Sequence, residues 1–222
     1  MNKYMVSYIL LIIGLILLFV SVINILIKYI KYKKINNDDI SGYDICKLLI
    51  DKHKISDISI IETKDSGKNT YNINRRVIKL SYSCYYGKDC FSLGISTFIA
   101  GFCILHDMSN RYISYIGRVF SKIWFVSISS IIVLIVSYLF RGYYSFVGLI
   151  LLIILFVYQY FKKCISNDII SVVNKEIDDM NNFSDNIKNG IKSVVSSIDF
   201  SYNVSLVITI LQICRLFIYI IL

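Results

Sequence analysis

The sequence predicts a mainly helical integral membrane protein that carries an α+β domain between its membrane helices. Hydrophobic residues make up 56% of the 222 residues and charged residues only 18%, whereas soluble domains carry about a quarter charged residues. The apolar residues are concentrated in runs long enough to cross roughly 30 Å of hydrocarbon. Basic residues mostly flank these runs and do not gather in one patch, so we expect a lipid bilayer and no nucleic acid as partner.

Four apolar runs are expected to span the membrane, and their positions define the domains. The runs are Met5 to Ile27, Val119 to Phe140, Phe146 to Phe161 and Ser205 to Leu222. The last contains Gln212 and Arg215, which are costly in lipid and should face protein or reach the interface. The expected order is an N-terminal transmembrane anchor (1–30), an α+β domain (31–118), a transmembrane hairpin (119–161), an amphipathic helical segment (162–204) and a C-terminal transmembrane helix (205–222).

The distribution of basic residues predicts the orientation. Sixteen of the 24 lie between Lys28 and Lys122, and five more lie between Lys162 and Lys192. Since cytoplasmic segments carry the excess of Lys and Arg, both polar segments should be cytoplasmic. In a competing topology Phe91–Leu105 crosses the membrane, but this run of about 15 residues is short for a span.

The segment from Asn36 to Arg118 shows alternating helix and strand signals. Ser41 followed by Asp44 resembles a capping box that starts a helix with Ile45, Leu48 and Leu49 on one face. The expected strands are Asp57–Thr63, Thr70–Asn74 and Val77–Ser81, and a second helix is expected from about Asp89 to His106. Lys64 to Lys68 reads as a turn.

The segment from Ser166 to Asn203 is expected to form two amphipathic helices separated near Ser184, a plausible N-cap. Each helix has one apolar stripe. The stripes are Ile169, Ile170, Val173, Ile177 and Met180 in the first helix, and Ile187, Ile191, Val194, Val195 and Ile198 in the second.

The six cysteines show no metal-binding spacing. Cys46, Cys84, Cys90, Cys103, Cys164 and Cys214 form no C-x-x-C pair. A zinc knuckle is therefore not expected, and free buried thiols are.

Several short segments occur in an order that resembles a known family. They are the helix start Ser41 to Asp44, the stretch Thr70 to Ser81, the group Tyr85-Tyr86-Gly87, Gly94, and Leu211 to Leu216. In this order and spacing they resemble the bacterial membrane-bound neutral zinc metallopeptidases of the YugP type. The resemblance implies a zincin-like fold for the α+β domain and a bacterial inner-membrane location.

The catalytic motif of that family is not retained. The resemblance places its H-E-x-x-H motif, which supplies two zinc ligands and a general base, at Phe98-Ile99-Ala100-Gly101-Phe102. A third family ligand is implied at Lys162, and the family's D-H-Y-D is Asn69-Thr70-Tyr71-Asn72 here. Neither Phe nor Ile can bind zinc or accept a proton, so no catalytic residue and no cofactor are expected.

Cys103, His106 and Asp107 offer an alternative position for a metal site. These residues share one helical face (i, i+3, i+4) beside the lost motif, and Cys and His at that spacing can bind zinc. The plainer interpretation is a core cysteine, a His at a helix end and a solvated Asp.

The most economical function is non-enzymatic. We expect a pseudopeptidase that binds a membrane protein or peptide in the former substrate cleft, with Phe98, Ile99 and Phe102 as an apolar helix face. The alternatives are a membrane metallopeptidase with a relocated metal site and a small transport subunit, the latter suggested by Gln212 and Arg215.

Overall fold

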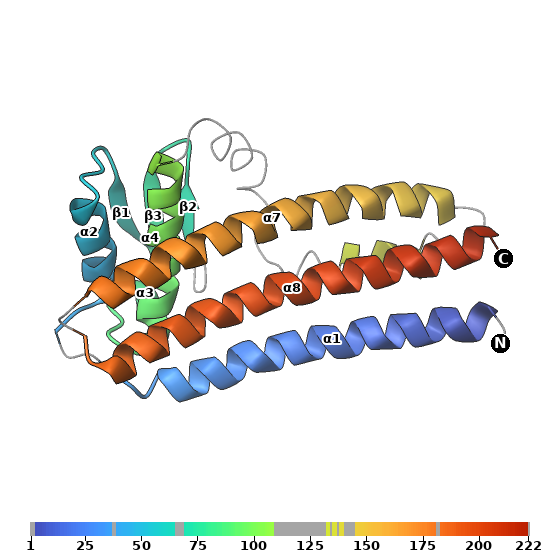
Figure 1. The fold of residues 1–222 in the computed structure, drawn as a ribbon, viewed down its shortest axis with the longest axis horizontal. Coiled ribbons are helices and arrows are strands. Elements are labelled where there is room, and N and C mark those ends of the chain that lie inside the picture. The colour runs from blue at the N-terminus through green and yellow to red at the C-terminus, as the bar shows by residue number, and fades with distance from the viewer. Residues whose placement is uncertain are drawn as a thin grey trace. The chain divides into compact units, whose positions relative to one another are not determined.

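The structure is a computed structural model that describes residues 3–36, 39–64, 69–108, 132–133, 135–136, 138–139, 145–180 and 183–221. Figure 1 shows that helices dominate the described residues, with one small sheet. The elements are α1 (Lys3–Tyr32), α2 (Gly42–Lys52), β1 (Ser59–Thr63), β2 (Thr70–Asn72), β3 (Val77–Ser81), α3 (Tyr82–Tyr85), α4 (Cys90–Met108), α7 (Ser145–Asp179) and α8 (Asp185–Ile221).

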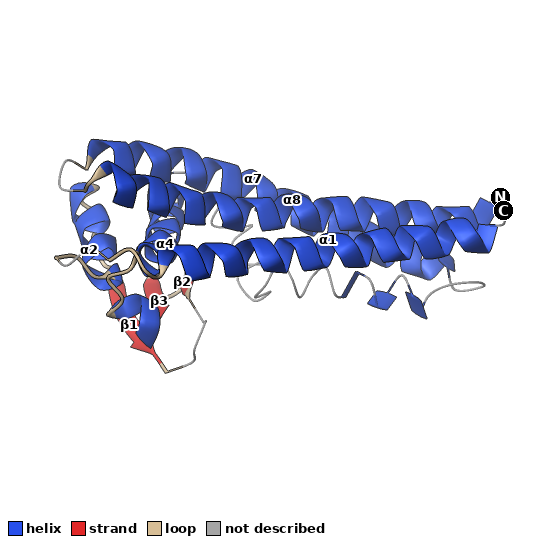
Figure 2. Cartoon of the chain, turned by 90° about the horizontal axis from the view of Figure 1, so that it is seen from below, coloured by secondary structure: helices blue, strands red, loops and turns tan. Residues whose placement is uncertain are grey.

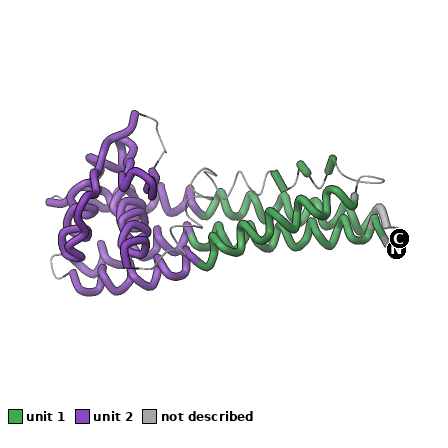
Figure 3. The backbone as a smooth tube through the Cα atoms, turned by 90° about the horizontal axis from the view of Figure 1, so that it is seen from above, with its two compact units in different colours: residues 1–24, 123–164, 199–222 green, residues 25–122, 165–198 purple. Residues whose placement is uncertain are grey.

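The chain divides into two compact units (Figure 3). Unit 1 combines Met1–Asn24, Ile123–Cys164 and Asp199–Leu222, and unit 2 combines Ile25–Lys122 and Ile165–Ile198. Helices α1, α7 and α8 each contribute a segment to both units. The candidate site of the family motif belongs to unit 2.

The described residues include four helices that are long and apolar enough to cross a membrane, which indicates a membrane protein. Two of them, Met5–Tyr32 and Phe146–Asp179, contain predicted spans, and a third, Asp185–Ile218, overlaps the predicted span Ser205–Leu222. The predicted span Val119–Phe140 lies largely outside the described residues. The fourth helix, Cys90–Met108, covers the run of the competing topology, but 61% of its most apolar window is buried within the protein, the largest share of the four.

Within unit 1, segments of α1, α7 and α8 lie side by side (Figure 1). The buried positions of α1 in this unit include Ser7, Gly14 and Ser21. They are small and seven residues apart, a spacing that keeps one face of a helix against its neighbour and lets backbones approach closely. The other faces of α1 carry exposed large apolar side chains, as lipid contact requires.

The amphipathic segments predicted at 162–204 are not separate helices. Helix α7 runs without a break from Ser145 to Asp179, and α8 runs from Asp185 to Ile221. The expected boundaries at 162 and 205 therefore fall inside helices, because no Gly, Pro or turn sequence interrupts the backbone there. The break near Ser184 is confirmed, and the Ser184 carbonyl accepts bonds from the amides of Ile187 and Lys188.

The sheet of unit 2 has the order β1-β3-β2. Strand β1 pairs in parallel with β3, from Ser59 opposite Val77 to Thr63 opposite Ser81. Strand β2 pairs antiparallel with β3, with Tyr71 opposite Ile78. All three predicted strands are confirmed, with β1 and β2 two residues shorter than expected.

Helix α2 begins with the predicted capping box. The Ser41 hydroxyl accepts a hydrogen bond from the Asp44 amide at 3.3 Å, and the Asp44 carboxylate accepts one from the Ser41 amide at 2.9 Å. Ile45 and Leu49 are fully buried, as expected, but Leu48 is 38% exposed. The prediction for Leu48 is wrong because the buried face of α2 turns toward Cys46 and Ile50 instead.

One hydrophobic core joins the elements of unit 2. Figure 2 shows α2 and α4 between the sheet and the long helices α7 and α8. Its buried residues include Ile45 and Leu49 of α2, Ile78 and Leu80 of β3, and Leu93, Ala100, Cys103 and Ile104 of α4. Helix α7 contributes Val173 and Ile177, and α8 contributes Ile191 and Val195. The first predicted stripe therefore faces this core along its length, and the second faces it through Ile187, Ile191 and Val195.

Candidate functional site

The segment Phe98 to Phe102 lies in the middle of α4, at the boundary between core and surface. Ile99 and Ala100 are buried, with 6% and 0% exposure. Phe98 and Phe102 are only half-buried and pack against the edge of the core. The apolar face predicted for these three residues is therefore buried at Ile99 and only partly buried at the two phenylalanines.

An aromatic and polar group lies beside Phe102. The rings of Tyr71 on β2 and Phe102 meet edge to face at 5.8 Å, an arrangement favoured by ring quadrupoles. The Tyr71 hydroxyl lies 3.1 Å from His106 Nδ1. Burial, followed by the neighbouring Cys103 thiol, raises the pKa of Tyr71, so this phenol stays protonated and cannot serve as a base at neutral pH.

Two of the three residues proposed as a replacement metal site, Cys103 and His106, lie beside Tyr71, and the third, Asp107, pairs with Arg76. Cys103 is fully buried, His106 meets Tyr71, and Asp107 forms an ion pair with Arg76 at 2.5 Å. Arg76 reaches Asp107 from the β2–β3 turn, where its φ of 49° places it in the left-handed region that few non-glycine residues adopt.

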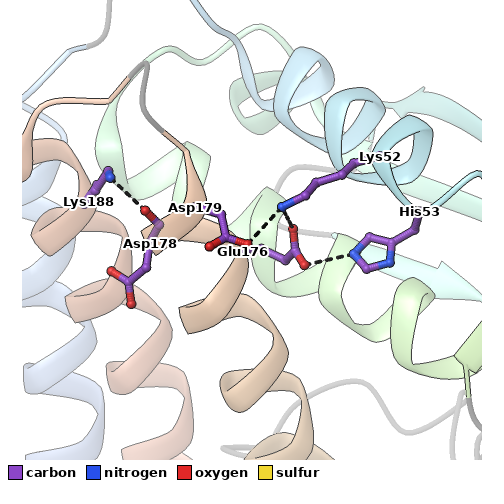
Figure 4. A network of polar contacts seen from close by, with 6 residues as sticks. All are labelled: Lys52, His53, Glu176, Asp178, Asp179 and Lys188. Carbon is purple, nitrogen blue, oxygen red and sulfur yellow. Dashed lines mark hydrogen bonds and ion pairs between the residues drawn. The ribbon is translucent and has the colours of Figure 1, made fainter.

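A second polar network joins α2 to α7 (Figure 4). Glu176, which is 5% exposed, accepts His53 Nε2 at 3.0 Å and pairs with Lys52 Nζ at 2.7 Å. Asp179 adds a contact to Lys52 at 3.2 Å. The hydrogen bond to Glu176 is the main cause that raises the pKa of Lys52. This network has no sequence signal, since 123 residues separate His53 from Glu176.

The polar residues of the last span face protein. Gln212 and Arg215 are 0% and 1% exposed. Arg215 Nε donates to Ser7 Oγ at 2.9 Å, and Gln212 Nε2 donates to the Leu10 carbonyl at 3.3 Å. The expectation that these two side chains avoid lipid is confirmed, and their partners on α1 indicate a structural role in joining α1 to α8.

The comparison with known families decides the relationship of the chain. A family model described as "Putative neutral zinc metallopeptidase" matches residues 7–221. The chain belongs to this neutral zinc metallopeptidase family. The match covers nearly all of the chain, so the resemblance found in its short motifs is confirmed. No curated protein and no solved structure matches it.

The residues to which the resemblance assigns the family's zinc motif do not fit zinc. Zinc in proteins is bound by imidazole nitrogen, thiolate or carboxylate oxygen. The side chains of Phe98, Ile99 and Phe102 offer none of these atoms. Among the described residues, no group of three His, Cys, Asp or Glu side chains is placed to hold a metal ion. These three side chains therefore supply no zinc ligand.

Lys162, at the implied position of the third family ligand, lies on α7 in unit 1. Its Nζ is 5.1 Å from the centre of the Tyr158 ring, a distance typical of a cation–π contact. An ammonium group has no lone pair to give to a metal. This position therefore adds no ligand to the family site.

Gly101, part of the surviving Ala-Gly spacer of the motif, has a packing reason to remain. A Cβ added at Gly101 would lie 2.5 Å from Val173 Cγ2 and 3.1 Å from Ile169 Cγ2, both on α7. Only a glycine lets α4 approach α7 this closely. The spacer therefore serves the helix contact independently of the metal chemistry.

Proposed function

We propose that this chain is a membrane pseudopeptidase, a member of the neutral zinc metallopeptidase family that binds a protein or peptide without cleaving it. The observation that carries the proposal is the replacement of the whole motif by Phe98, Ile99 and Phe102. Loss of the base alone would leave a metal shell, but loss of both helix ligands removes the shell as well.

The environment of the former motif supports a binding role. Phe98 and Phe102 are half-buried, so each keeps part of its ring at the surface of unit 2. Tyr71 packs on Phe102 and holds that ring in place. Aromatic side chains with fixed geometry and partial exposure are typical anchors at protein interfaces.

The packing beneath this face supports retention of the family scaffold without its metal. Ile99 and Ala100 fill the core, and Gly101 keeps the close contact with α7. Burying an apolar side chain such as Ile99 contributes roughly 1.5–3 kcal/mol to the free energy of unfolding. We further propose that the α+β part is zincin-like and that it faces the cytoplasm of a bacterial inner membrane, as the basic residues favour.

The catalytic part of the proposal is tested by metal content and activity. The full chain, purified in detergent, is analysed for zinc by mass spectrometry and assayed on a mixture of unstructured peptides with and without chelator. We expect far less than one zinc per chain and no chelator-sensitive cleavage. About one zinc per chain together with chelator-sensitive cleavage would overturn the pseudopeptidase assignment.

The binding part is tested by site-specific photo-crosslinking in membranes. A photoreactive phenylalanine analogue is placed at Phe102 and, as the control, at Leu48, which is exposed on α2 of the same unit. We expect a discrete adduct from position 102 that is absent from position 48. No adduct from position 102, or the same adducts from both positions, would reject the former cleft as the binding site.

A further inference from the structure

Four tyrosines form a continuous aromatic surface on unit 2, which we call the tyrosine face. Tyr82, Tyr85 and Tyr86 come from α3 and the residue after it, and Tyr43 comes from the first turn of α2. The ring centres of Tyr82 and Tyr86 are 5.0 Å apart, those of Tyr86 and Tyr85 are 4.9 Å apart, and those of Tyr85 and Tyr43 are 4.9 Å apart. The contacts run from ring to ring without a gap.

The tyrosine face is exposed although its backbone is firmly held. Tyr82 and Tyr86 are 66% and 55% exposed. Beneath them Cys84 is buried, and its carbonyl oxygen lies only 2.0 Å from where a Cβ at Gly42 would be. The Gly42 amide also donates to the Gly87 carbonyl at 3.0 Å. The rings are therefore presented on a rigid support, which lowers the entropy lost on binding.

Two carboxylates act on this face. The Tyr86 hydroxyl donates to Glu62 Oε2 at 3.2 Å. Burial raises the pKa of Tyr85, and Tyr43, Glu62 and Asp44 raise it further. Glu62 and Asp44 thus place two negative charges beside the tyrosines in a chain whose net charge is +9.

We propose that the tyrosine face, with Glu62 and Asp44, binds an arginine-bearing segment of a partner protein. A guanidinium stacks on aromatic rings and pairs with carboxylates in one planar contact, which an ammonium cannot do as well. Tyrosine and arginine are both enriched among the residues that dominate binding energies. The proposal rests on different residues from the Phe98 and Phe102 face and stands whether or not that face binds anything.

The same chemistry argues against two other occupants. An anionic membrane surface attracts Lys and Arg and would be repelled by Glu62 and Asp44. A second copy of this chain would bring a net charge of +9 against another +9, and this long-range repulsion slows association. Both occupants are outcomes of the test below.

The test uses the full chain in neutral detergent and fluorescent peptides. One probe is a short glycine-serine peptide with three arginines, and its neutral control carries citrulline in their place. We expect the arginine peptide to bind and the citrulline peptide not to. The double variant Tyr82→Ala/Tyr86→Ala should weaken binding at least about ten-fold, and Glu62→Gln should weaken it several-fold.

Two controls separate binding from folding. Tyr160→Ala removes a tyrosine of the predicted membrane span in α7 and should leave peptide binding unchanged. Glu62→Gln alters one exposed side chain, so it reports on charge even if the double tyrosine variant unfolds. Equal binding of the arginine peptide to the parent, the double variant and Glu62→Gln would overturn the proposal, as would no binding to the parent.

The remaining outcomes assign the face to another occupant. Hydrogen exchange of Tyr82 to Gly87 is compared in nanodiscs of zwitterionic and of anionic lipid, and protection that appears only with anionic lipid would assign the face to the membrane. Self-association of the parent that the double variant abolishes, without peptide, would assign it to a second copy. Either result would overturn the arginine-segment proposal.

Discussion

His53 Nε2 lies 3.0 Å from Glu176 Oε1, joining the end of α2 to the polar side of α7. Glu176 also pairs with Lys52, so one buried carboxylate holds two cationic or polar side chains of α2. Figure 4 shows both side chains reaching Glu176 from the same helix end. The contact therefore fixes α2 against α7 within unit 2.

Replacing Glu176 should destabilise unit 2. We expect Glu176→Ala to lower the free energy of unfolding by about 1–2 kcal/mol. The loss is small for a buried charged group because Lys52 and His53 are partly exposed and can form hydrogen bonds with water in the variant. The matched control is Asp178→Ala, which removes an exposed carboxylate paired with Lys192 and should cost less than about 1 kcal/mol. Thermal melts in detergent followed by circular dichroism measure both. Equal losses would show that Glu176 has no special role.

A methyl group at Gly101 should be poorly tolerated. Gly101→Ala places a Cβ 2.5 Å from Val173 Cγ2, and such overpacking costs about 1–3 kcal/mol. Val173→Ala removes the opposing methyl groups, so the double variant should lose less than the sum of the two single variants. A double-mutant cycle of melts checks this coupling. Additive losses would mean that the α4–α7 contact does not require the glycine.

Restoring the family motif should not restore zinc. Positions 98 and 102 are half-buried, so a histidine ring placed there can reach water. Phe98→His and Phe102→His should therefore each lower the free energy of unfolding by about 1 kcal/mol. Ile99→Glu, at a 6% exposed position, should cost about 2–3 kcal/mol because it buries a carboxyl group. We expect none of the single variants to bind zinc in metal analysis. A Phe98→His variant that melts below Ile99→Glu would contradict the observed burial order.

Stability should fall at alkaline pH because of buried thiols. Burial raises the pKa of Cys46, whereas the unfolded thiol ionises near about 8.5. The Cys46 thiol therefore holds its proton more tightly in the folded state than in the unfolded state. The stability that this thiol contributes is fully present below about pH 8.5 and is lost progressively above it. Cys46→Ala should show a shallower decline in melting temperature between about pH 8.5 and 10. The same decline in the parent and in Cys46→Ala would exclude the Cys46 thiol as a source of the pH dependence.

Topology can be read with single cysteines. Cys46, Cys84, Cys90 and Cys103 are buried, so Cys164→Ser/Cys214→Ser provides a background with four protected thiols. In intact cells an impermeant reagent should label Tyr143→Cys but not Ser66→Cys, since the basic flanks favour a cytoplasmic segment Lys28–Lys122. Labelling of Ser66→Cys from outside, with Tyr143→Cys protected, would reverse the proposed orientation.

The sequence by itself determined the features that depend on local spacing. The apolar runs in α1, α7 and α8, the capping box of Ser41 and Asp44, the three short strands and the bounds of α4 all follow from patterns within about twenty residues. Side-chain periodicity and capping are set by neighbours along the chain, so they can be recognised without the fold. The sequence also predicts that Phe98 to Phe102 replace the family's zinc motif.

Only the tertiary structure decided which distant residues meet. It paired His53 with Glu176, placed Tyr43 beside Tyr85 and gave Arg215 its partner Ser7. It also separated the half-buried Phe98 and Phe102 from the buried Ile99, which their residue types could not distinguish. These relationships depend on how helices and strands pack, and packing is set by the shape of the whole core rather than by any local pattern.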